Sequence, residues 1–345
     1  MKIIRYFSSS IFLIGLLSFS ILIGSGYNTY LSYERFYNPD SETYTNIARG
    51  NFSNQSLIRR YRIIVPMLAN VVSIPISRVY YKIVSDKRNA YDWPLLTGFF
   101  LVNTALMSFA AMLIFRIMQF QGLTDTARVA GILAFLAGGR WASMVAAHPI
   151  TDSLTILSIA AMVYGFLSQN RVLLCSAIIV GLLSKESFVL FFPLVLIFSD
   201  RHLKVPVVLS MIVSLALYFG VKYRIDSLSV TSTQASLEQA FDTFKSVQAS
   251  VIKIFSVKGF ADIFSVYGFF SLIFISGLFY KEFRLRIKPA FNRLFIAFSL
   301  IILAHMLLSM ELARMFFLGS AMFVPFLAKC FDIHPLFKNL HLNKG

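Results

Sequence analysis

Five groups of polar and charged residues interrupt an otherwise strongly apolar sequence. Each lies at the end of an apolar stretch, or, in one case, in the middle of one. The groups are Asp40, Glu42 and Tyr44; Arg59, Arg60 and Arg62; His148 and Asp152; Lys185 and Glu186; and Glu311 and Arg314. Because an unpaired charge in hydrocarbon costs several kcal/mol, each group needs a partner, water or a function that retains it.

These residue types suit the transfer of a sugar from a lipid phosphate. A phosphate leaving group needs cations that stabilise the charge developing on the departing oxygen, and Lys185 and the arginines of 59–62 can supply them. The acceptor hydroxyl needs a carboxylate that takes its proton, for which Asp40 is the candidate. Asp152 or Glu42 would orient the acceptor or hold a divalent metal ion such as Mg²⁺ or Mn²⁺.

The candidate site therefore has two catalytic carboxylates, Asp40 and Asp152. Substrate binding is assigned to Glu42, Tyr44, Arg59, Arg62, His148, Lys185, Glu186, Glu311 and Arg314.

Each group also has an explanation that involves no function. Loop carboxylates are commonly solvated, arginines can hold a segment at the head-group level, and an acid in a first helical turn complements the helix dipole. Glu311 and Arg314 are three residues apart and can pair on one helix face. Lys185 and Glu186 fit such an explanation least well, because adjacent residues on a helix do not face each other.

The composition indicates a polytopic helical membrane protein. Of the 345 residues, 57% are hydrophobic and 14% are charged, whereas about a quarter are charged in a soluble domain. The Lys and Arg residues that give the net charge of +16 are expected mainly in cytoplasmic loops and near anionic head groups. No soluble basic face that could bind nucleic acid is visible. Cys175 and Cys330 form no recognisable pair or metal-binding spacing.

Hydropathy divides the chain into spans and loops. Clear spans are expected at 7–26, 94–115, 127–147, 150–167, 203–222, 263–280, 291–309 and 312–328. The first is interpreted as an uncleaved helix, with a cleaved signal peptide as the alternative. The segment 63–76 is short for a span and contains two prolines. The stretch 172–198 is long for one helix and short for two.

The basic loop 281–293 and both termini are placed in the cytoplasm by the positive-inside rule. The chain is then a single integral-membrane domain. Its expected parts are an outer loop at 31–93 with a juxtamembrane segment, a helical core at 94–222, an outer loop at 223–262 with an interfacial helix, C-terminal helices at 263–330 and a cytoplasmic tail at 331–345.

Two arrangements of ten spans satisfy this orientation. In one, 63–84 lies at the outer surface and 172–198 is a hairpin with Lys185 and Glu186 at its outward tip. In the other, 63–84 spans and 172–198 is one helix with both charges at mid-membrane. Charge placement alone does not choose between them, but only the hairpin puts all five polar groups on the outer face.

The order of these features resembles the GT-C superfamily of integral-membrane glycosyltransferases, which includes protein O-mannosyltransferases and aminoarabinose transferases. Asp40 in "DSETY" resembles the acid of their first outer loop. Arg62 and Pro66 in "RIIVP" resemble an Arg and a Pro that enter the next apolar segment. Asp152 in "HPITDSL" and Lys185 in "SKESFVLFFP" resemble an Asp that opens a later helix and a Lys before an apolar run ending in Pro.

The resemblance covers about residues 1–200 and implies an all-α, GT-C-like bundle of about ten transmembrane helices. It also implies a polyprenyl-phosphate sugar donor. The chain departs from the pattern in two ways. It shows no large soluble C-terminal domain, and "DSE" at Asp40 and Glu42 is looser than a paired Asp-x-Asp, so metal dependence stays open.

The sequence therefore predicts a glycosyltransferase at the outer, periplasmic face of a bacterial inner membrane. It would move a sugar from polyprenyl phosphate to a glycan, lipid or protein acceptor in cell-envelope or polysaccharide biosynthesis. Three alternatives stay open. One is a transporter or flippase for lipid-linked sugars, with ionisable residues near the midplane. The others are a polysaccharide polymerase that uses outer-loop arginines and a non-catalytic membrane subunit.

Overall fold

A computed structural model describes residues 10–32, 39–53, 55–56, 59–83, 92–227, 247–309 and 311–337. Every regular element in these ranges is a helix, which confirms the predicted all-α class. Residues 228–246, the middle of the outer loop expected to hold an interfacial helix, lie outside the described residues.

The helices include several that can cross a bilayer. By length and composition, four qualify individually: α2 (Ser10–Leu31), α4 (Ile64–Ile83), α5 (Trp93–Phe120) and α11 (Arg201–Asp226). The total rises to eight if each of four bent helix pairs forms one span. The chain is therefore a helical membrane protein with four to eight candidate spans among its described residues.

Three predicted straight spans are bent pairs instead, and each bend falls at glycine. The pairs are α6 (Asp125–Ala137) with α7 (Trp141–Ala147), α13 (Val257–Tyr267) with α14 (Phe269–Gly277), and α17 (Leu312–Leu318) with α18 (Ser320–Ile333). Their bends are 57°, 101° and 80°. Gly268 has φ +47°, and a Cβ at Gly139 would lie 1.9 Å from the Ser265 carbonyl oxygen, so the bends need residues without side chains.

The fourth bent pair joins α15 (Lys281–Ile287) and η4 (Lys288–Ala290) to α16 (Arg293–Ser309) at 80°. Its first half carries the basic loop residues, and Phe283 and Ile287 are buried in a second, smaller hydrophobic cluster with Ile273 and Cys330.

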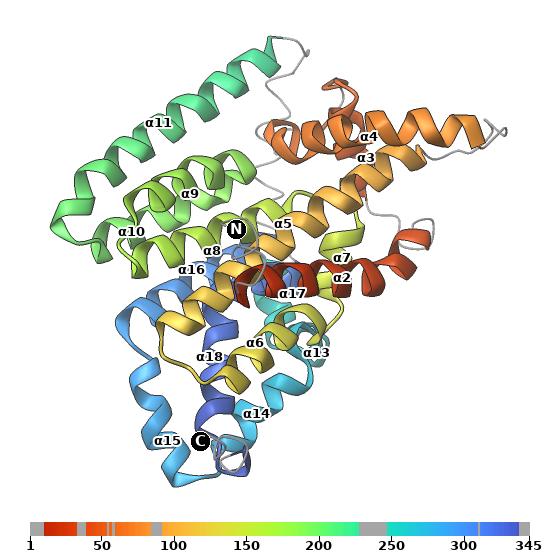
Figure 1. Ribbon diagram of the computed structural model, residues 1–345. Helices are drawn as coiled ribbons and strands as arrows, with labels where there is room; N and C mark the ends of the chain where they lie inside the picture. Colours follow the sequence, from red (N-terminus) through yellow and green to blue (C-terminus); the bar gives the residue numbers. More distant parts are fainter. Residues whose placement is uncertain are drawn as a thin grey trace, which may run out of the picture.

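Helix α5 is the centre of the fold. It packs against α2, α4 and α8 (Asp152–Leu167), and Figure 1 shows it crossing the middle of the molecule. The Asp92 side chain caps its start by accepting from the Leu95 amide at 3.2 Å. Gly98 allows α4 to approach closely, since a Cβ there would lie 2.3 Å from the Ala69 carbonyl oxygen.

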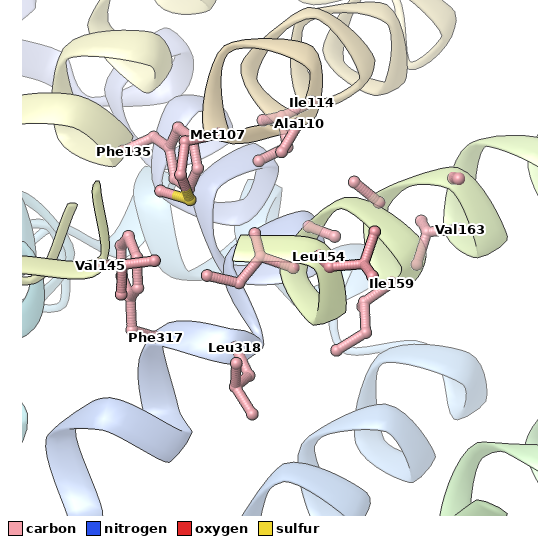
Figure 2. Close-up of a cluster of buried hydrophobic side chains, with 14 of the residues drawn as sticks. Met107, Ala110, Ile114, Phe135, Val145, Leu154, Ile159, Val163, Phe317 and Leu318 are labelled. Atoms are coloured by element: carbon pink, nitrogen blue, oxygen red, sulfur yellow. The ribbon is translucent and has the colours of Figure 1, made fainter. Parts of the chain in front are cut away.

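The hydrophobic core lies where α5 meets the helices around it. Figure 2 shows Met107 and Ile114 of α5 beside Phe135 of α6, Leu154 of α8 and Phe317 of α17. The Phe135 and Phe317 rings stack at a centroid distance of 5.5 Å. This core fixes the start of α8 against α17, and both of these helix starts carry predicted site residues.

The stretch 172–198 forms a hairpin. Helix α9 (Arg171–Ser184) is followed by Lys185, whose backbone is extended. The chain then returns through η3 (Glu186–Phe191) and α10 (Phe192–Phe198). The Phe188 ring packs back onto Gly181. Lys185 and Glu186 therefore lie at the tip, and the single-helix alternative is wrong.

Helix α4 is one continuous 20-residue helix with Pro75 inside it, so it extends beyond the short apolar stretch 63–76 and covers nearly all of the segment 63–84 that both predicted arrangements contain. The first turn accommodates Pro66 without the loss of an intrahelical bond. The hairpin at 172–198 belongs to the first predicted arrangement, in which 63–84 lies at the outer surface; by length and composition α4 is also a candidate span.

Candidate functional site

Arg314, on α17, lies at the centre of a buried cluster of charges. Its Nη1 donates to Asp40 Oδ2 at 2.9 Å and to Glu311 Oε2 at 2.6 Å. Its Nε donates to Asp152 Oδ2. Arg314 is 4% exposed, Asp40 6% and Asp152 0%. One guanidinium therefore joins two carboxylates from helices distant in sequence, in addition to its local partner Glu311.

Lys185 extends the cluster from the hairpin tip. Its Nζ lies 3.5 Å from Asp152 Oδ1 and 3.3 Å from Met315 Sδ. Thr155 and Ser184 share a hydrogen bond of 3.0 Å that ties the start of α8 to the end of α9 and so positions the lysine. The buried partner of Lys185 is Asp152. Glu186, its neighbour in sequence, binds a different cation.

Glu186 binds Arg62 through a bidentate ion pair. Arg62 Nη2 donates to Oε1 at 2.6 Å and Nε donates to Oε2 at 3.0 Å. Such a fork is among the stronger protein ion pairs. Arg62 Nη1 also donates to the Tyr44 hydroxyl at 3.0 Å. Arg62 thus joins the predicted group of Arg59, Arg60 and Arg62 to the groups that contain Tyr44 and Glu186.

The three arginines of 59–62 each bind a different carboxylate. Arg59 Nη2 lies 2.7 Å from Asp40 Oδ1, so both Asp40 oxygens contact guanidinium groups. Arg60 points elsewhere, and its Nη2 donates to Asp226 Oδ1 at 2.6 Å. The 3₁₀ turn η2 (Arg59–Tyr61) explains why Arg60 points away from the other two arginines. Side chains three residues apart in such a turn, here Arg59 and Arg62, lie on the same side.

Arg60 anchors η2 to the end of α11 rather than joining the cluster. The Tyr61 hydroxyl donates to the same Asp226 oxygen at 2.7 Å. Burial and the hydrogen bond to Asp226 raise the pKa of Tyr61, so this phenol stays protonated and can donate.

Asn103 holds the turn that precedes Asp152. Its Nδ2 donates to the backbone carbonyls of His148 and Ile150 at 2.9 and 3.2 Å, and its Oδ1 accepts from Ser153 at 2.6 Å. His148 is buried at the end of α7 and takes part through this backbone carbonyl. The sequence did not single out Asn103, although a lone amide within the apolar run 94–115 was a usable signal.

Replacement of Asn103 by alanine should destabilise the protein, because two buried carbonyls and the Ser153 hydroxyl would lose their partner. We expect a loss of about 1–3 kcal/mol in the free energy of unfolding. Equilibrium unfolding in mixed micelles measures it. A matched Asn51→Ala change, at an exposed position, should have little effect, and equal stability of the two variants would contradict the role of Asn103.

The structure brings nine predicted residues into one neighbourhood. They are Asp40, Tyr44, Arg59, Arg62, Asp152, Lys185, Glu186, Glu311 and Arg314. Glu42 instead lies on the exposed face of α3 (Pro39–Ala48). The cluster holds four cations and four carboxylates, so its charges balance.

Within the described ranges, no three or more His, Cys, Asp or Glu side chains are grouped to hold a metal ion. Comparison of the chain with protein-family models, with curated proteins and with solved structures found no match in any of the three. Fold and geometry define the class as a helical membrane protein with a buried, charge-balanced cluster at the meeting point of α3, α8, α17 and a helical hairpin.

Proposed function

We propose that this protein is a GT-C-like membrane glycosyltransferase that moves a sugar from a polyprenyl-phosphate donor to an acceptor at the outer face of a bacterial inner membrane. The observation that carries the proposal is the bridge from Arg314 to Asp40 and Asp152, with Lys185 and Arg59 beside it. A cluster maintained only for stability does not need so many charges, since apolar residues of similar volume often serve as well.

In the substrate-free protein, carboxylates compensate the cations. A phosphate group entering beside Lys185 and Arg59 offers these cations a second anionic partner. Hydrogen bonds from ionised donors to phosphate are short and strong, and they gain strength as charge builds on the leaving oxygen. The same contacts therefore bind the donor and stabilise its departure.

Asp40 would act as the base. Its two oxygens contact Arg59 and Arg314, and a donor phosphate that engages Arg59 releases one oxygen for the acceptor. The bond between the anomeric carbon and the phosphate oxygen breaks while a bond to the acceptor oxygen forms. The acceptor proton passes to Asp40, and polyprenyl phosphate leaves as the anion.

An apolar cavity with one wall residue on α17, the helix that carries Arg314, supports a lipid-linked donor. It has a volume of about 440 Å³ and lies between α13, α14, α16 and α18. Its wall includes Phe316, two residues after Arg314, and Met306 of α16. A polyprenyl chain in this cavity would carry its phosphate to the charged cluster without leaving an apolar environment.

A flippase or transporter for lipid-linked sugars is the second candidate. It is favoured by the break between α9 and η3, since broken helices commonly form transport sites. Proteoliposomes with a polyprenyl-phosphate radiolabelled sugar and a membrane extract as the acceptor source separate the two. Label transferred to a new product supports the enzyme. Label that only becomes accessible on the opposite leaflet supports the transporter and contradicts our proposal.

Lys185→Met is expected to reduce transfer and to weaken donor binding at least tenfold, because the phosphate loses a cation that lies where water is scarce. Binding of polyprenyl phosphate to the purified variant measures this. Lys329→Met is the matched control, since Lys329 lies on α18 in a partly exposed pair with Asp332. Donor affinity unchanged by Lys185→Met would remove the lysine from phosphate binding.

The proposed orientation can be tested by cysteine labelling. With Cys175 and Cys330 replaced by alanine, Asn51→Cys should react with an impermeant thiol reagent in intact cells, because the loop after α3 would lie outside. Leu336→Cys, which is also at an exposed position, should react only after permeabilisation. The reverse pattern would place the site on the cytoplasmic face.

A further inference from the structure

A second apolar groove lies on another part of the molecule. It lies between the start of α4 and the end of α11 and has a volume of about 460 Å³. Phe52, Ile63, Met67, Leu217, Gly220 and Val221 line it. It shares no lining residue with the cavity near α13. Figure 1 shows α4 and α11 at the top of the view and α13, α14 and α18 below, with α8 and α9 between.

One wall residue of this groove is next in sequence to a cluster residue. Ile63 directly follows Arg62, which binds Glu186 and Tyr44. Phe316, in the wall of the first cavity, lies two residues after Arg314 on α17. Each of the two apolar recesses therefore has a wall residue within two positions of a cluster residue, and the two recesses have different walls.

One cation lines the groove. Arg224 is part of its wall and is exposed, while Lys222, two residues earlier on α11, lies over the Tyr61 ring at 5.7 Å. Within the described ranges, the acid nearest to them in sequence, Asp226, is already bound by Arg60 at 2.6 Å. An apolar groove with an exposed arginine in its wall matches a lipid with an anionic head group, because cations attract anionic lipids.

We propose that this groove binds the hydrocarbon chain of an anionic lipid and that this lipid is the acceptor of the sugar. The inference rests on the proposed function. The acceptor hydroxyl would enter from the Arg62 and Tyr44 side and pass its proton to Asp40. The anomeric carbon would exchange its phosphate oxygen for the lipid oxygen, which yields a glycolipid and polyprenyl phosphate.

Apolar burial supplies the affinity of the groove, at about 25 cal/mol per Å² of chain surface. Its occupancy can be blocked without disturbing the fold. Gly220 lines the groove, and a Cβ added there meets no atom within 4 Å. Gly220→Phe therefore fills the groove from an exposed helix face. Gly24→Phe on α2 is the matched control, because Gly24 is exposed in an equally open space.

Binding is tested with vesicles that contain photoactivatable phosphatidylglycerol or photoactivatable phosphatidylethanolamine. We expect phosphatidylglycerol to label residues 217–225 at least fivefold more strongly than phosphatidylethanolamine does. This difference should disappear in Gly220→Phe and in Arg224→Gln but persist in Gly24→Phe. Equal labelling by both lipids in every variant means contact with bulk lipid only, and it overturns the groove.

The acceptor role is tested with polyprenyl-phosphate radiolabelled sugar and a lipid extract of the native membrane. Wild-type protein and Gly24→Phe should form an organic-soluble labelled product, and Gly220→Phe should form at least tenfold less while it binds polyprenyl phosphate normally. Label found only in protein or water-soluble glycan overturns the lipid acceptor. If wild type transfers no sugar to any acceptor, the proposed function fails, whereas the labelling result still decides lipid binding in the groove.

Discussion

Arg314→Met is expected to lower the free energy of unfolding by about 3–5 kcal/mol, because breaking a buried ion pair leaves the opposite charge uncompensated. The change removes the guanidinium that contacts Asp40, Asp152 and Glu311. Equilibrium unfolding in mixed micelles measures the loss. Among the changes considered, this one should affect stability most.

The matched control is Arg49→Met. Arg49 also pairs with an aspartate, Asp92, at 2.9 Å, but its side chain is 52% exposed. Exposed pairs contribute about 0–1 kcal/mol, so this variant should remain close to wild type. If the orphaned carboxylate is the cause, adding Asp152→Asn to Arg314→Met should restore part of the stability. Equal effects of Arg314→Met and Arg49→Met would show that the buried cluster is not a coupled unit.

Asp40→Asn is expected to reduce sugar transfer by about 10²–10⁴-fold, the usual loss when a general base is removed. Asparagine has nearly the same shape, but its single carbonyl oxygen can accept from only one of the two guanidinium groups that contact Asp40, and it cannot take the acceptor proton. Donor binding should change little, because the carboxylate acts on the acceptor. Turnover and donor affinity, measured on the same purified variant, test both parts.

The control for this change is Asp125→Asn, which neutralises an exposed acid at the start of α6, outside the cluster. It should transfer sugar at the wild-type rate. Melting temperatures of both variants separate a catalytic effect from a structural one. An Asp40→Asn protein with near-normal turnover would exclude this residue as the base. A protein that loses activity only in proportion to folded material would give Asp40 a structural role.

The sequence by itself determined the class of protein and the positions of the unusual residues. Long apolar stretches can cross a bilayer only as helices or closed barrels, and the low charge content excludes an ordinary soluble domain. Charged residues inside such stretches are detectable without a structure because burying them is costly. Asp40, Asp152, Lys185 and Arg314 could therefore be selected before any contact was known.

The cost of placing Lys185 and Glu186 at mid-membrane favoured a reversal of the chain at Lys185, and the structure contains this reversal. Other local features did not follow from the sequence. Pro75 made 63–76 look too short to span, yet α4 continues through it. The spans predicted at 127–147, 263–280 and 312–328 bend at glycines, because the neighbouring backbones approach more closely than a side chain allows.

Only the tertiary structure decided which charge pairs with which. Lys185 lies next to Glu186 in sequence but pairs with Asp152, and Glu186 pairs with Arg62. Arg60 binds Asp226, while Arg59 on the same turn binds Asp40. Arg314 and Asp40 are 274 residues apart. Hydropathy is a local property of the chain, whereas these pairings depend on the relative positions and rotations of packed helices, which the side chains buried between them determine.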